Sequence, residues 1–140
     1  MGYGLAWSSY EYTTTKPKQI DDDTKVLSAL QVIGSDTDQS HLATGIKIGQ
    51  GANLTRELGN LPGNTCTPRY LADQAIRLAD RFNNLSCEVF DENMLEEIGM
   101  HCMLSVSRGS DEPARFIILQ YQGAGDPNLK PKILVGKGVT

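Results

Sequence analysis

The chain has 140 residues, enough for a domain with its own core, and its 39% hydrophobic and 21% charged residues are ordinary for a soluble globular protein. Its net charge of −4 argues against a nucleic-acid partner, because phosphate binding rests on an excess of basic residues. No apolar run approaches the roughly 20 residues of a membrane span, so no membrane partner is expected. The N-terminus lacks a signal-peptide pattern, and 3 widely spaced cysteines fit reduced thiols, which together predict a cytoplasmic protein.

The N-terminal part predicts one helix and one strand. Tyr3, Trp7 and Tyr10 recur at helical spacing, so we expect a short helix that packs this aromatic face on a neighbour. Residues 25–33 are rich in β-branched and aliphatic side chains and predict a strand.

A long helix is expected next. The polar residues 34–39 indicate a connector and the best domain boundary in the chain, after which Ser40 can cap a helix that runs to about Asn60. Three glycines weaken this helix by roughly 1 kcal/mol each relative to alanine, unless their face packs closely on another element: Gly45, Gly49 and Gly51.

The next helix has clear signals at its start and along its length. Thr67 and Pro68 are expected as its N-cap and first residue. Apolar residues then recur at spacings of three and four until Asn83 and Asn84 end the pattern: Leu71, Ala72, Ala75, Ile76, Ala79 and Phe82.

The rest of the chain predicts three strands, at residues 87–90, 115–121 and 132–135, the last of them buried. Asp91 is expected to cap a short helix over residues 92–98. Helices that alternate with short aliphatic strands indicate an α/β sheet.

His101 and Cys102 could form a nucleophile pair only if both side chains pointed the same way. We interpret this stretch as extended, and adjacent residues of a strand point to opposite faces. The pair is therefore not a candidate site.

The last strand delivers a lysine to a glycine-rich turn. Lys137 lies between Gly136 and Gly138, and ligands of open α/β sheets usually bind at the carboxyl ends of strands. The alternative is an ordinary solvated turn lysine. A Walker phosphate loop is excluded, because Pro131 and Gly138 occupy the positions of its first glycine and its Ser or Thr.

Two segments, residues 53–72 and 134–140, together resemble the leucyl (cytosol) aminopeptidase family of two-metal peptidases. The first is similar to a helix-and-loop segment of the family in these residues: Arg56-Glu57-Leu58, Asn60, Pro62, Asn64, Thr67-Pro68 and Leu71-Ala72. The second, Leu-Val-Gly-Lys-Gly-Val-Thr, is similar to the strand that leads into the family's metal site. Residues 4–10 are similar to the end of the family's N-terminal domain.

The resemblance implies a parent enzyme that removes N-terminal residues, with a leucine-type preference, from peptides by means of a water activated by two Mn²⁺ or Zn²⁺ ions. The parent is expected to be a cytoplasmic homo-hexamer. Lys137 matches a lysine that ligates one metal through its amine, which requires the unprotonated form. The other ligands and the assisting residues of the family lie beyond the position of Thr140, so no catalytic residue is carried over.

The resemblance also implies that the chain is a part of a longer protein. We expect residues 1–39 to be the C-terminal part of an N-terminal α/β domain, residues 40–60 a connecting helix, and residues 61–140 the start of the catalytic α/β sheet. One amine without carboxylates cannot hold a dication against water, so this chain alone is expected to be inactive. The alternative is a non-catalytic α/β binding or assembly module that reuses the fold.

Arg56, Asn60 and Asn64 have two interpretations. They could orient the active-site face of the parent enzyme. Polar side chains around a helix end more often satisfy backbone groups, and we favour that structural role.

Overall fold

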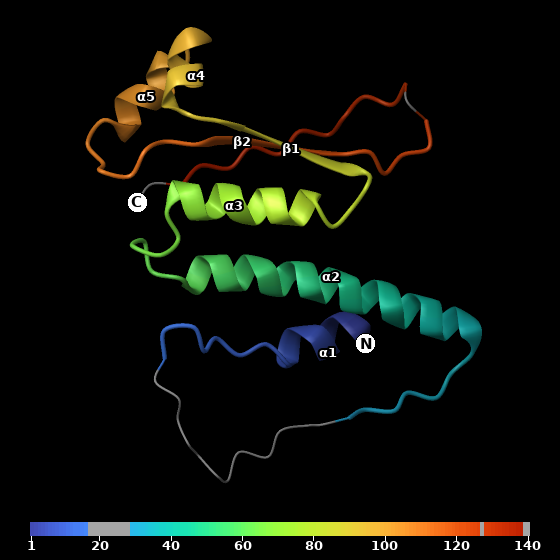
Figure 1. The fold of residues 1–140 in the computed structure, drawn as a ribbon. Coiled ribbons are helices and arrows are strands. Elements are labelled where there is room, and N and C mark those ends of the chain that lie inside the picture. The colour runs from blue at the N-terminus through green and yellow to red at the C-terminus, as the bar shows by residue number, and fades with distance from the viewer. Residues whose placement is uncertain (17–28, 127, 139–140) are drawn as a thin grey trace. The chain divides into compact units, whose positions relative to one another are not determined.

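The computed structural model describes residues 1–16, 29–126 and 128–138, which form two compact units, Met1–Leu61 and Pro62–Thr140 (Figure 1). The first unit contains helices, and the second combines helices with a two-stranded sheet. The chain therefore has the mixed α/β character that the sequence predicts. In the described ranges, no helix combines the length and the apolar character that crossing a membrane requires.

In the first unit, helix α1 (Gly2–Ser8) lies against helix α2 (Asp36–Asn60), as Figure 1 shows. The ring centroids of Tyr3 and Trp7 are 5.5 Å apart on α1, which confirms the short aromatic helix near the N-terminus. Tyr10 follows the helix rather than belonging to it.

Glycines allow the backbones of α1 and α2 to approach closely. A Cβ atom added to Gly45 would lie 2.9 Å from the backbone nitrogen of Tyr3, and one added to Gly49 would lie 2.5 Å from the Cβ of Ala6. Real Cβ atoms essentially never make contacts this short. Close packing therefore explains two of the three helix glycines, whereas a Cβ on Gly51 would meet nothing within 4 Å.

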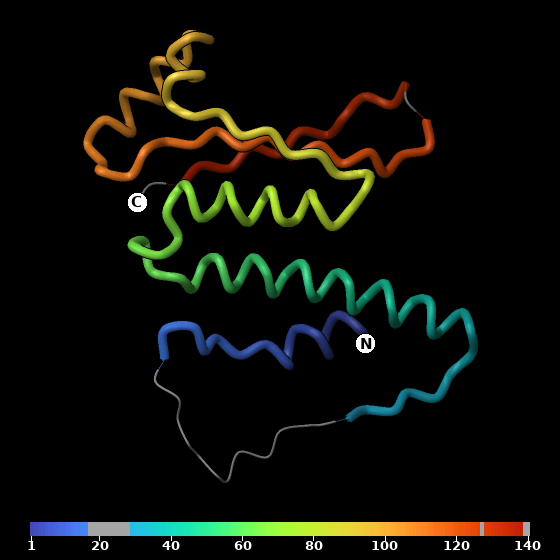
Figure 2. The backbone as a smooth tube through the Cα atoms, viewed as in Figure 1, coloured from blue at the N-terminus to red at the C-terminus, as the bar shows by residue number. Residues whose placement is uncertain are grey.

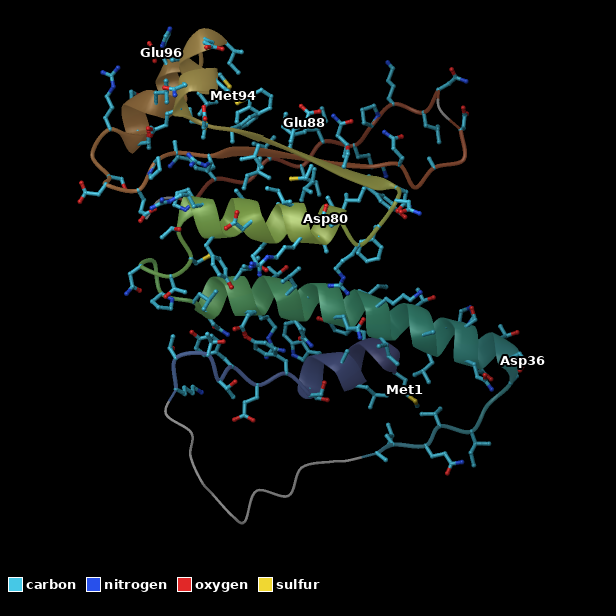
Figure 3. The ribbon with its side chains drawn as sticks, in the orientation of Figure 1. Met1, Asp36, Asp80, Glu88, Met94 and Glu96 are labelled. Atoms are coloured by element: carbon cyan, nitrogen blue, oxygen red, sulfur yellow. The ribbon has the colours of Figure 1, made fainter. Side chains whose placement is uncertain are left out.

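Helix α2 begins earlier than predicted, at the end where Figure 3 labels Asp36. Its N-cap is Ser35, whose hydroxyl accepts a hydrogen bond from the backbone N–H of Asp38, while the Asp38 carboxylate accepts from the backbone N–H of Ser35. This capping box satisfies two helix-end donors and sets the start of the helix. The predicted cap at Ser40 is therefore wrong, whereas the predicted end at Asn60 is confirmed.

The predicted strand over residues 25–33 is not confirmed. Residues 25–28 lie outside the described residues, and residues 29–33 have no regular secondary structure. Ile33 is 92% exposed, and no strand among the described residues pairs with this stretch. β-branched residues favour strands mainly through packing and cross-strand contacts, which are missing here.

In the second unit, helix α3 (Pro68–Ala79) begins as predicted. The Thr67 hydroxyl accepts a hydrogen bond from the backbone N–H of Tyr70, and Pro68 is the first helical residue. The helix ends at Ala79 with Asp80 as its C-cap, so the apolar pattern continues past the helix itself.

The sheet consists of β1 (Leu85–Phe90) and β2 (Phe116–Tyr121), which pair antiparallel along their whole length. Both strands are confirmed within two residues of the predicted bounds. Figure 1 shows α3 lying alongside this pair, in agreement with its contacts to both strands.

Two short helices, α4 (Glu92–Glu97) and α5 (His101–Ser107), connect the strands. Asp91 caps α4 as predicted, and its carboxylate accepts from the backbone N–H of Met94, a residue that Figure 3 labels on this helix. Helix α5 replaces the extended stretch that we expected at residues 101–106. Short apolar runs do not distinguish a strand from a buried helix, and here Leu104 packs into the core.

The core of the second unit lies between these helices and the strand ends. Leu95 is fully buried and packs with Leu104 and Ala114. The rings of Phe90 and Phe116 cover this cluster, with centroids 6.0 Å apart in an edge-to-face arrangement.

The predicted buried strand at residues 132–135 is wrong for this structure. Residues 130–138 form neither helix nor strand, and Figure 2 shows them as irregular backbone at the red end of the tube. Ile133, Leu134 and Val135 are 80%, 97% and 90% exposed. An aliphatic stretch forms a buried strand only beside a partner strand, and among the described residues none pairs with it.

Candidate functional site

The structure places Lys137 on an exposed, irregular segment between Gly136 and Gly138. The strand end that was expected to present this side chain is not formed. Lys137 therefore has no built site around it in the described residues.

The described residues contain no group of three or more His, Cys, Asp or Glu side chains that could hold a metal ion. Two divalent ions require several anionic or neutral oxygen and nitrogen ligands, and one amine does not meet that need. The donor set on these residues thus does not fit a two-metal centre by itself.

In the first unit, Arg56 combines cation–π contacts with side-chain hydrogen bonds. Its guanidinium carbon lies 4.2 Å from the ring centroid of Trp7 and 4.3 Å from that of Tyr10. The same side chain donates hydrogen bonds to the carbonyl oxygen of Trp7 at 2.8 Å and to Oδ1 of Asn53 at 3.1 Å. Asn53 in turn donates to the carbonyl oxygen of Ala6 at 2.6 Å. We call Trp7, Tyr10, Asn53 and Arg56 the Arg56 clamp.

A second set of contacts extends from the hydroxyl of Tyr10. This hydroxyl donates to Oε2 of Glu57 at 2.7 Å and accepts from the side-chain amide of Asn60 at 3.1 Å. The Thr14 hydroxyl donates to the other oxygen of Glu57. Burial raises the pKa of Tyr10 above 10.0, and the hydrogen bond to the Glu57 carboxylate raises it further, because that bond needs the protonated phenol.

Arg56 satisfies a backbone group, the carbonyl oxygen of Trp7, as the structural interpretation predicts, whereas Asn60 donates to the side-chain hydroxyl of Tyr10 rather than to a backbone group. The sequence did not indicate Glu57 or Tyr10 as partners, because they lie 47 positions apart in the chain. Asn64 has a different setting. It lines a shallow surface hollow of the second unit with these residues: Gly63, Gly109, Ser110, Asp111 and Glu112.

Two further pairs lie in the second unit. Arg69 and Glu112 form an ion pair with an N–O distance of 3.1 Å, and two guanidinium nitrogens of Arg69 donate to this carboxylate. Nδ1 of His101 lies 3.5 Å from Oε2 of Glu96, and both side chains are exposed. His101 and Cys102 are neighbours at the start of α5 rather than in a strand, and no contact links His101 to the thiol of Cys102 among the described interactions.

The comparison with protein families identifies the class of the chain. The model described as cytosol aminopeptidase family, catalytic domain, matches residues 53–140. The chain therefore belongs to the cytosol aminopeptidase family, as the resemblance predicts.

Relatives of known name agree with this assignment. The "Probable cytosol aminopeptidase" of Chromohalobacter salexigens is 52% identical over 120 residues, a match that covers 81% of this chain and 24% of the relative. The protein of the same name from Bordetella petrii is 46% identical over 143 residues, covering 98% of this chain and 28% of the relative. The chain thus spans about a quarter of the length of these relatives.

Among solved structures, the chain is similar to "Bottromycin maturation enzyme BotP in complex with Mn". The TM-score is 0.67 at 29% sequence identity, and the match covers 84% of this chain and 24% of that one. A second structure of the same enzyme gives a TM-score of 0.65.

Proposed function

We propose that this chain is a part of an aminopeptidase that hydrolyses N-terminal residues, with a leucine-type preference, from peptides with the help of two divalent metal ions. The observation that carries the proposal is the match of residues 53–140 to the family's catalytic domain. Relatives named cytosol aminopeptidases support a cytoplasmic peptidase, and the neighbour solved with Mn supports a divalent metal. By resemblance to the family, the whole protein would be a homo-hexamer.

Lys137 would contribute one amine ligand to this metal pair. The flanking glycines carry no side chains, so other ligands could approach the amine closely. The remaining ligands would have to come from outside the described residues, because these contain no cluster of acidic, His or Cys side chains for a metal. The 140-residue chain alone would therefore be inactive as a peptidase.

The role of Lys137 can be tested in the longer protein with Lys137→Met and the matched control Lys132→Met, a lysine of the same exposed segment. We expect Lys137→Met to lower hydrolysis of leucine p-nitroanilide by more than the roughly 10- to 100-fold that is typical of outer-shell partners, and to lower the bound Mn²⁺ or Zn²⁺. The control is expected to keep both. Equal activity and metal content in the two variants would remove Lys137 from the site.

A second candidate function is a non-catalytic α/β binding or assembly module. It would require no metal ligands from outside the described residues, which contain no group of acidic, His or Cys side chains for a metal. Intact mass and C-terminal sequencing of the protein from its source would separate the two. A product ending at Thr140 supports the module, whereas a product that continues into further metal ligands supports the peptidase.

A further inference from the structure

We propose that the Arg56 clamp is a latch that fastens the N-terminal segment of the chain onto α2. The two rings come from the segment before α2, and the cation and Asn53 come from α2 itself. The latch therefore joins parts of the chain that are 46 to 49 positions apart (Arg56 with Tyr10 and Trp7).

The chemistry of the clamp requires a planar cation. A guanidinium can lie flat between two aromatic faces and still donate hydrogen bonds from its edge, whereas an ammonium cannot do both. The guanidinium carbon of Arg56 lies over the rings of Trp7 and Tyr10, 4.2 and 4.3 Å from their centroids, and one terminal nitrogen donates both hydrogen bonds. Among the described residues, its cation has no carboxylate partner within ion-pair distance, so π faces and uncharged oxygens hold it.

The Arg56 clamp connects two regions of the chain that the family comparison distinguishes. Asn53 and Arg56 lie inside the range that matches the catalytic-domain family model, whereas Trp7 and Tyr10 precede that range. The latch therefore ties the start of the family-matched region to the chain before it. This inference concerns contacts within the first unit and does not depend on peptidase activity.

The test uses hydrogen exchange and the fluorescence of Trp7, the one tryptophan of the sequence, on the 140-residue chain. We expect Arg56→Lys and Arg56→Met to raise exchange in residues 1–10 by about tenfold and to move the Trp7 emission to longer wavelength. Exchange in β1 and β2 serves as the internal control, because these strands lie in the other unit. Arg81→Met is the matched control, since Arg81 lies 5.7 Å from one ring only, that of Phe82.

A second pair of variants separates the ring of Tyr10 from its hydroxyl. Tyr10→Phe keeps the aromatic face over Arg56 and is expected to keep the Trp7 emission, whereas Tyr10→Leu is expected to shift it as Arg56→Met does. If Arg56→Lys matches the original chain in both readouts, or if Tyr10→Leu behaves like Tyr10→Phe, the latch is overturned. Faster exchange throughout β1 and β2 in the Arg56 variants would likewise overturn it, because the effect would then be general unfolding.

Discussion

Whether a glycine destabilises α2 or is required there depends on which atoms would contact a Cβ at that position. Glycine costs a helix about 1 kcal/mol relative to alanine, so each one needs a compensating reason. Gly45 and Gly49 have that reason, because α1 occupies the space of their missing Cβ atoms. Gly51 faces open space and has no such reason in the described residues.

The two kinds of glycine predict opposite effects for the same substitution. Gly45→Ala is expected to destabilise the first unit by about 1–3 kcal/mol, because its Cβ would press on the backbone of Tyr3. Gly51→Ala is expected to stabilise α2 by about 1 kcal/mol. Urea unfolding followed by circular dichroism measures both, and stabilisation by Gly45→Ala would contradict the packing of α1 on α2.

At the scale of elements, the start of α2 depends on Ser35 rather than on Ser40. Ser35→Ala is expected to cost about 1 kcal/mol of helix stability, whereas Ser40→Ala should be nearly neutral, because the Ser40 hydroxyl has no hydrogen bond among the described interactions. Thermal unfolding of the two variants distinguishes the caps. A larger loss for Ser40→Ala would restore the start predicted from the sequence.

The same cap predicts a pH dependence. Hydrogen bonds from the Ser35 hydroxyl and backbone N–H lower the pKa of Asp38 below its usual 3.8. A carboxylate with a lowered pKa stabilises the fold above pH 3.8 and loses this contribution as the pH falls through its folded-state pKa. Helical signal is therefore expected to decrease below pH 3.8, and less so in Asp38→Asn, which keeps an acceptor but does not titrate. An identical acid profile in Asp38→Asn would show that other carboxylates cause the loss.

Helix ends with local signals were predictable, whereas strand predictions held only where the folded chain supplies a partner strand, as it does for β1 and β2. Thr67-Pro68 and Asp91 mark their helices within one turn of chain, and both caps were correct. Ser35 and Asp38 carried a similar signal that we interpreted as a connector. The strands at 25–33 and 132–135 had suitable residues, but pairing depends on a second strand that local sequence does not specify.

In the candidate site too, the residues could be identified from the sequence, but their distant contacts could not. The predicted strand end with its two glycines pointed to Lys137, and the family resemblance supplied its expected metal-binding role, but in the structure this lysine lies on an exposed, irregular segment. Arg56 and Asn60 stood out in the motif, but their partners Trp7 and Tyr10 lie far away in the sequence. Only the folded chain shows these contacts.

At the scale of the whole molecule, the exposed aliphatic residues 133–135 predict that copies of the chain associate with one another. Ile133, Leu134 and Val135 present unpaired backbone and apolar side chains, which favours strand pairing between copies. We expect the 140-residue chain to self-associate with rising concentration, and Leu134→Lys to reduce this. Leu129→Lys is the matched control, since it adds the same charge at another exposed leucine. Sedimentation velocity that shows equal association in both variants would contradict a role for this segment.

The proposal with the widest consequences is that the chain is part of a metal-dependent aminopeptidase. The most direct test is the release of leucine from a leucyl peptide by the longer protein, before and after removal of metal with EDTA and after return of Mn²⁺ or Zn²⁺. The account predicts hydrolysis that is lost with the metal and restored by the ion. Hydrolysis that survives complete metal removal, or none in the metal-loaded longer protein, would contradict it.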